Sequence, residues 1–131
     1  MATDEIISYE RLLVLARHSA TVTCECACGL ALCAGWERIA VSFPEKQMRV
    51  LGTLLRDPYV EPTFAEYHPA GTNYWSRDAP IAVHHYPYNR CSVWQCMVCE
   101  RCCLMYTEGG GYYVERRIRS LDPKMIVDVD V

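Results

Sequence analysis

Nine cysteines in 131 residues, gathered in two tight groups, constrain this chain more than any other feature. The first group runs from Cys24 through Cys26 and Cys28 to Cys33, and the second lies within residues 91–103. Thiols so close together in sequence usually hold a metal ion or form disulfide bonds. The choice between these two uses decides most of what the sequence predicts.

The redox state of these thiols depends on the compartment. A secretory signal needs a basic start followed by an unbroken apolar stretch. Here the first charged residues are the acidic Asp4 and Glu5, and Glu10 and Arg11 interrupt the apolar residues that follow. No run approaches the ~20 apolar residues of a membrane span. We therefore predict a cytoplasmic protein without a membrane segment, whose thiols are reduced or metal-bound; disulfides remain the alternative.

Composition predicts one folded domain covering residues 1–131. Hydrophobic residues make up 51% of the chain and charged residues 22%, which supports a packed core. The net charge of −3 disfavours a nucleic-acid partner, because phosphate binding draws on a surplus of cations. Arginines interleaved with aromatic residues keep nucleic acid possible, but a protein partner is preferred.

The N-terminal part, residues 1–56, is expected to hold two helices and a hairpin. Apolar spacing predicts a helix over residues 4–17, capped by Thr3 with Asp4 and Glu5 in its first turn. Alternation predicts a strand over residues 20–28, paired with a second strand over residues 36–43. The capping box of Ser42 and Glu45 predicts another helix over residues 43–55.

The rest of the chain divides into two stretches. Residues 57–90 hold five of the seven prolines and many aromatic side chains, which predicts an irregular segment packed onto the body. The sequence pattern of residues 91–131 predicts a strand, a cysteine knuckle and a long hairpin with its turn at residues 108–111. The expected fold class is α+β.

Cys96-Met-Val-Cys99 is the strongest local motif. The C-x-x-C spacing lets two thiolates converge on one ion, and it is a recurrent half-site for tetrahedral zinc. Because the motif lies between a strand-like run and a hairpin, it resembles the knuckle of a zinc ribbon over residues 91–117. The resemblance implies a structural zinc site, and a zinc ribbon brings a second C-x-x-C-like pair that this chain lacks.

Two more ligands must complete a closed site. Cys24 and Cys26 are the preferred second pair, because thiols on one face of a strand can lean onto one ion. Such a site would join the N-terminal part of the chain to the cysteine knuckle, across about 70 residues of sequence. The less favoured candidates are Cys91, Cys28 and Cys102, and a histidine remains an alternative ligand.

Two other uses of the cysteines stay open. The spacing of Cys91, Cys96 and Cys99 matches part of a plant-type ferredoxin pattern, which suggests an iron–sulfur cluster in an electron-transfer or redox protein. A free cysteine acting with His84 or His85 would instead give a cysteine-dependent enzyme. The preferred hypothesis is a non-enzymatic zinc module that binds another macromolecule.

Overall fold

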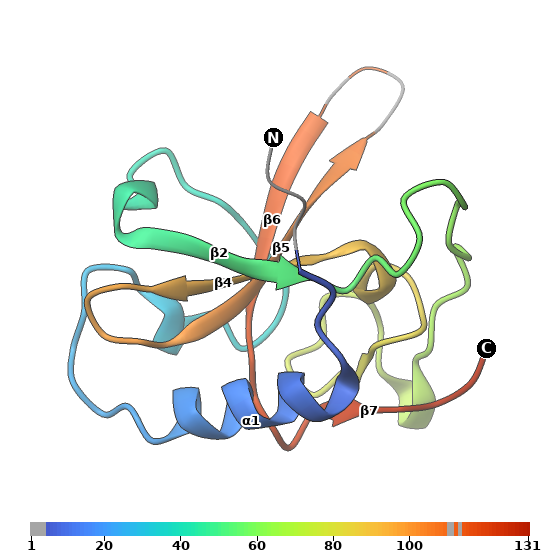
Figure 1. Cartoon of the computed structure of the whole chain (residues 1–131), viewed down its shortest axis with the longest axis horizontal. Helices are drawn as coiled ribbons and strands as arrows, with labels where there is room; N and C mark the ends of the chain where they lie inside the picture. Colours follow the sequence, from blue (N-terminus) through green and yellow to red (C-terminus); the bar gives the residue numbers. More distant parts are fainter. Residues whose placement is uncertain (1–4, 110–111, 113) are drawn as a thin grey trace.

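A five-stranded antiparallel sheet forms the centre of the protein. The computed structural model describes residues 5–109, 112 and 114–131. Neighbouring strands in the sheet follow the order β1-β6-β5-β4-β2, so β5 lies in the middle (Figure 1). The strand bounds are β1 Glu37–Arg38, β2 Met48–Thr53, β4 Ser92–Cys96, β5 Cys102–Gly109 and β6 Val114–Ser120.

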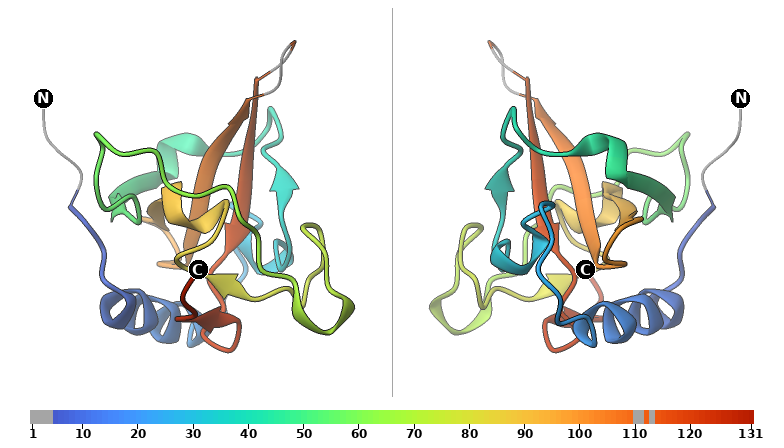
Figure 2. Two further views of the ribbon diagram at one scale, coloured as in Figure 1. Left: turned by 90° about the vertical axis from the view of Figure 1, so that its right-hand side faces the viewer. Right: turned by 90° about the vertical axis from the view of Figure 1, so that its left-hand side faces the viewer.

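One α-helix and a small second sheet complete the fold. α1 covers Tyr9–Ala20, and within the described residues it is the only α-helix. β3 (Ile81–Ala82) pairs in parallel with β7 (Ile126–Val127), and α1 runs beside the β7 segment in the views of Figures 1 and 2. Four short 3-10 helices cover Leu30–Leu32, Glu45–Gln47, Pro69–Gly71 and Tyr88–Arg90. The fold is a small domain of mixed α and β structure.

The first helix begins later than the sequence predicts. Ser8 caps it by accepting a hydrogen bond from the backbone N–H of Arg11, at 3.2 Å. The preceding residues join the edge of β2, where Thr53 donates its N–H to Glu5 and accepts from Ile7. The predicted cap Thr3 and first-turn Asp4 lie outside the described residues.

Gly52 permits this close approach of the N-terminal segment. A Cβ atom at Gly52 would lie 2.3 Å from the Glu5 carbonyl oxygen, so a larger residue would push the two backbones apart. Pairing with β2 thus sets residues 5–7 in an extended form, and the helix starts only beyond them.

The predicted hairpin of residues 20–28 and 36–43 is wrong. Residues 21–29 form no strand, and the short β1 pairs with β6 instead. The alternation that suggested a strand comes from Cys26 and Cys28, which turn inward while Glu25 and Ala27 stay exposed. A spacing of two residues along a loop can therefore arise from a shared buried contact as well as from a pleat.

The predicted second helix over residues 43–55 is also wrong. Ser42 is followed only by the single 3-10 turn that begins at Glu45, after which the chain becomes β2. Its register opposes Met48 to Cys96 and Val50 to Trp94 on β4. Pairing with a strand far along the sequence overrides the local capping signal.

The C-terminal stretch follows the sequence prediction more closely. β4, a turn and the β5–β6 hairpin succeed one another, while residues 57–90 hold only β3 and two 3-10 helices. Gly110 and Gly111 of the predicted hairpin turn lie outside the described residues. The far ends of β5 and β6 extend beyond the rest of the described chain (Figure 1).

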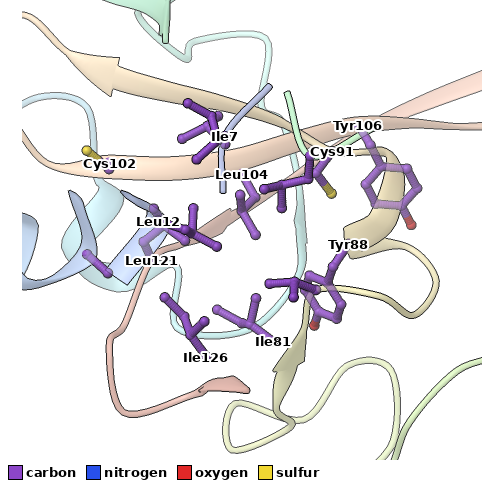
Figure 3. Packing of buried hydrophobic residues seen from close by; sticks show 14 of the residues in the cluster. Ile7, Leu12, Ile81, Tyr88, Cys91, Cys102, Leu104, Tyr106, Leu121 and Ile126 are labelled. Carbon is purple, nitrogen blue, oxygen red and sulfur yellow. The ribbon is translucent and has the colours of Figure 1, made fainter. Parts of the chain in front are cut away.

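The two faces of the sheet bury separate sets of side chains. One set, here called the first apolar cluster, joins α1, the sheet and the β3–β7 pair through residues such as Leu12, Leu104 and Ile126 (Figure 3). The other, the second apolar cluster, contains Met105 and Ile118. Leu104 and Met105 are neighbours on β5 and enter opposite clusters, as strand alternation requires.

A buried charge fixes the irregular segment on the first side. Arg119 of β6 has no exposed surface, and it donates hydrogen bonds to the carbonyl oxygens of Ala34, Arg77 and Ala79 and to the hydroxyl of Tyr88. These acceptors replace the water that a guanidinium would otherwise keep. The arginine thereby joins β6 to three separate loops.

Candidate metal centre

Four cysteine sulfurs meet at one end of the second apolar cluster. The Sγ atoms of Cys26, Cys28, Cys96 and Cys99 all lie within 4.8 Å of one another. Two of these residues come from the loop after α1 and two from the end of β4 and the turn that follows. The arrangement brings together segments that are separated by about 70 residues of sequence.

Two sulfur contacts run between the two segments. Cys26 Sγ lies 3.8 Å from Cys96 Sγ, and Cys28 Sγ lies 3.7 Å from Cys99 Sγ. Four sulfurs bound to one zinc ion at ~2.3 Å in a tetrahedron are about 3.8 Å apart. The side chains could therefore hold a metal ion with little rearrangement.

The knuckle is shaped by backbone hydrogen bonds around Cys96. Its N–H donates to the carbonyl of Arg101 at 2.9 Å, and its carbonyl accepts from the N–H of Glu100 at 2.8 Å. Glu100 takes a positive φ of 74°, which returns the chain toward β5. The N–H groups of Val98 and Cys99 are left pointing at the Cys96 sulfur.

The other loop is fixed just beyond its two cysteines. Gly29 has a φ of 69°, a left-handed conformation that turns the chain after Cys28. The buried Leu30 then enters the second cluster, and Ser120 hydrogen-bonds to the carbonyl oxygens of Leu30 and Cys33. These contacts to β6 hold Cys26 and Cys28 against the knuckle.

Gln47 joins the centre from a third segment. Its side-chain amide donates to the sulfurs of Cys26 and Cys96, at 3.7 and 3.5 Å, and its backbone carbonyl accepts from the N–H of Met97 at 2.7 Å. Hydrogen bonds from such outer residues orient metal ligands and tune their basicity. Gln47 was not a sequence candidate, and no local motif identifies it.

The three buried thiols of the centre differ in acidity. Burial acts to raise the pKa of Cys96, but the N–H groups of Cys99 and Val98 and the Gln47 amide outweigh it and lower that pKa to about 7. Burial raises the pKa of Cys28 and of Cys99. The sulfurs of Cys26 and Cys99 add to the effect at Cys28, whereas at Cys99 the Cys28 sulfur opposes it. Four thiolates so close together repel one another, so a cation is the natural partner for the fully ionised set.

The remaining cysteines lie elsewhere. Cys24, a preferred candidate from the sequence, is exposed and outside the group of four sulfurs, whereas the less favoured Cys28 is inside it. Cys91 and Cys102 are buried in the first cluster, where Cys91 Sγ donates to the carbonyl of Pro87 at 3.2 Å. Cys33 and Cys103 pack in the second cluster beside the group.

Histidines do not approach the cysteines as an enzyme of the cysteine–histidine type requires. In the described part of the chain, Nε2 of His18, of His68 and of His84 hydrogen-bonds to a carboxylate rather than to a thiol. His85 is buried with an unpartnered Nδ1, and burial lowers its pKa. The geometry therefore favours metal binding over thiol–imidazole chemistry.

Comparison with known proteins adds no relative. No family model, no curated protein and no solved structure matches this chain. None of the described helices is both long and apolar enough to cross a membrane. The four convergent cysteines remain the feature of the described chain that points most directly to a function.

Proposed function

We propose that this protein binds one structural zinc ion through Cys26, Cys28, Cys96 and Cys99, and that the resulting module binds another protein. The observation that carries the proposal is the sulfur spacing of 3.7 and 3.8 Å across the two loops. That spacing fits the edges of a zinc–thiolate tetrahedron. The zinc-ribbon likeness is then limited to the knuckle, since the second ligand pair is the C-x-C of Cys26 and Cys28.

A single ion fits better than an iron–sulfur cluster. The four thiolates of a cluster are divided among two or four irons, so ligands of different irons stand farther apart than ligands of one ion. All four sulfurs here lie within 4.8 Å of one another. Cys91, which the ferredoxin-like spacing would need, is turned into the first cluster.

A structural role follows from the ligand set. A catalytic zinc keeps one position open for water or substrate, whereas four thiolates close the coordination sphere. The ion would also join the loop after α1 to the end of β4, which constrains the fold. Thiolates of this kind persist in a reducing compartment such as the cytoplasm.

The knuckle tip supports a protein as the partner. Met97 and Val98 lie between two of the ligands, and they are 56% and 67% exposed. Apolar residues held outward by a rigid turn suit a protein contact. Nucleic acid is less favoured because Arg117 is already paired with Glu108 and Glu115.

Metal analysis tests the zinc site directly. The tag-free protein, purified without added metal, should contain one zinc per chain and show no visible absorbance; replacing zinc by cobalt(II) should give the spectrum of a tetrahedral thiolate site. Cys28→Ser should abolish stoichiometric zinc. Iron with a visible band, or no metal at all, would contradict the proposal.

A site-specific crosslinker tests the partner. A photoreactive residue at position 97 should capture a discrete cellular protein, whereas the same residue at the fully exposed position 41 should not. The captured protein, once purified, should bind wild type and bind Met97→Ser at least ten times more weakly. Equal capture at both positions would contradict a knuckle-tip contact.

A further inference from the structure

We propose that the four-cysteine centre is a peroxide-responsive site, in which oxidation forms the disulfides Cys26–Cys96 and Cys28–Cys99 and releases the metal. The inference rests on the proposed zinc site and adds a reaction to it. Its basis is the contact of the sulfurs between the two loops: Cys26 Sγ lies 3.8 Å from Cys96 Sγ, and Cys28 Sγ lies 3.7 Å from Cys99 Sγ. Oxidation of the centre would therefore replace a cross-link through the metal by a cross-link through two disulfides.

Access to the centre is uneven. Cys26 is partly exposed, whereas Cys28, Cys96 and Cys99 are buried. A small hydroperoxide consequently meets the Cys26 sulfur first. The sulfur of Cys96 stands 3.8 Å away, in the place of a resolving thiolate. Gln47 donates to both of these sulfurs and keeps them on one side of the centre.

The first disulfide needs one equivalent of hydrogen peroxide. The Cys26 thiolate attacks one peroxide oxygen, the O–O bond breaks, and Cys26 becomes a sulfenic acid while the leaving hydroxide takes a proton to form water. The Cys96 thiolate then attacks Cys26 Sγ, forming the S–S bond and expelling a second hydroxide, which is also protonated. Two electrons pass from the two thiolates to the peroxide.

A second equivalent of peroxide converts Cys28 and Cys99 in the same way. Loss of the first thiolate pair leaves the zinc with two protein ligands, and the ion departs as hydrated Zn²⁺. In total, two peroxides and four protons give two disulfides, four waters and one free zinc ion. Each new bond still ties the loop after α1 to the knuckle, so the fold keeps its cross-link.

The choice of partner thiols sets this reaction apart from simple oxidation of the motifs. Disulfides within C-x-C and C-x-x-C would release the zinc but would also free one loop from the other. The structure instead places Cys26 against Cys96 and Cys28 against Cys99. Retention of the native fold after zinc loss is thus a direct consequence of the proposed pairing.

Tryptic mapping can separate the two pairings. Cleavage after Arg17, Arg38, Arg90 and Arg101 puts Cys26 and Cys28 in residues 18–38, and Cys96 and Cys99 in residues 91–101. Zinc-loaded protein treated with hydrogen peroxide should yield these two peptides joined by two disulfides. It should also release one zinc per chain to a chromogenic chelator, and a dithiol reductant with added zinc should restore the starting state.

Matched variants identify the bonds. Cys24→Ser should release zinc and form the linked peptides as wild type does, since Cys24 is outside the centre. In Cys26→Ser/Cys96→Ser, peroxide should still join the two peptides through one disulfide. Unlinked peptides with internal disulfides, zinc retained after peroxide has oxidised Cys24, or sulfinic acids without disulfides would each overturn the inference.

The zinc content before peroxide treatment is a separate test of the proposed function. Zinc present and then retained would leave the structural site intact and remove only the redox reaction. Absence of zinc in the untreated protein would overturn both proposals together. Near-ultraviolet circular dichroism of the oxidised protein should keep the wild-type signal of its buried Trp36; loss of that signal would contradict the conserved cross-link.

Discussion

The two faces of the sheet are closed by different chemistry. On the first face, 15 buried residues from α1, the sheet and the β3–β7 pair pack together, and most are aliphatic or aromatic. On the second face, the buried cluster of the described residues has eight members, and four of these are cysteines: Cys28, Cys96, Cys99 and Cys103. The second face therefore removes much less apolar surface from water, and less burial means less stabilisation.

The difference explains where a metal is useful. Small domains whose core is limited commonly rely on a metal or a disulfide for stability. In this protein the candidate centre lies on the weakly packed face. There the loop after α1, residues 21–29, forms no strand that could pair with the sheet. The first face needs no such cross-link, because α1 and the irregular segment already cover it.

Removal of the metal should have the largest effect. Free zinc at a thousandfold over its Kd would stabilise the folded chain by about 4 kcal/mol, and a chelator removes that contribution. We expect a large drop in melting temperature, with amide protection lost first around Ile118 on the second face. Chelator already saturated with zinc is the control. An unchanged melting temperature with free chelator would show that the second face stays folded without metal.

Arg119→Met should test how the first face closes. The change leaves the carbonyls of Ala34, Arg77 and Ala79 without their donor, and unsatisfied buried groups cost ~1–3 kcal/mol each, so we expect a loss of about 3–5 kcal/mol in the free energy of unfolding. Arg38→Met, at a side chain that is 75% exposed, should cost less than ~0.5 kcal/mol. Urea unfolding of the zinc-loaded variants measures both losses of stability. Equal losses in the two variants would contradict the role of Arg119 in joining β6 to the loops.

Leu104→Ala and Met105→Ala form a matched pair across the sheet. Both residues are buried on β5, and truncation of either should cost about 2–5 kcal/mol in the zinc-loaded protein. In the metal-free protein the cost at Leu104 should persist, whereas the cost at Met105 should shrink because its surroundings have already loosened. Denaturant unfolding with and without zinc measures the four values. Equal costs at Met105 in both states would show that the two faces unfold as one unit.

Sequence reasoning succeeded where local signals and long-range pairing agree. Between Ser92 and Ser120 the apolar strand runs, the C-x-x-C turn and the glycine-rich turn all predict the same strands that the structure contains. The segment after Ser42 shows the opposite case, because its capping box favours a helix while its pairing with β4 requires a strand. A propensity carries no information about a pairing strand that lies far along the sequence.

The candidate centre was likewise predictable only in part. The spacing of Cys96 and Cys99 marks a half-site by itself, but Cys24, Cys26 and Cys28 offer two equivalent C-x-C pairs. What separates them in the structure is the left-handed turn at Gly29 and the contacts of the following residues with β6. Those contacts depend on the folded sheet, so spacing could not select Cys28 over Cys24.

Gln47→Leu should weaken the centre without unfolding the protein. The change removes the amide that donates to Cys26 and Cys96 but keeps the size of the side chain. Loss of such an outer hydrogen bond typically lowers metal affinity ~10-fold or more. Competition with a chelator of known zinc affinity measures the change. Lys46→Leu, at the exposed neighbouring position, should leave the affinity unaltered; an equal loss in both variants would contradict a direct role for the amide.

Cys24→Ser should have the smallest effect, and it decides which C-x-C pair belongs to the second face. Because Cys24 is exposed and lies outside the group of four sulfurs, we expect one zinc per chain and a change in stability within ~0.5 kcal/mol. Zinc content and melting temperature, read beside those of Cys28→Ser, give the comparison. If Cys24→Ser lost its zinc while Cys28→Ser kept it, the ligand pair would be Cys24 and Cys26, and Cys28 would be an ordinary buried thiol of the second cluster.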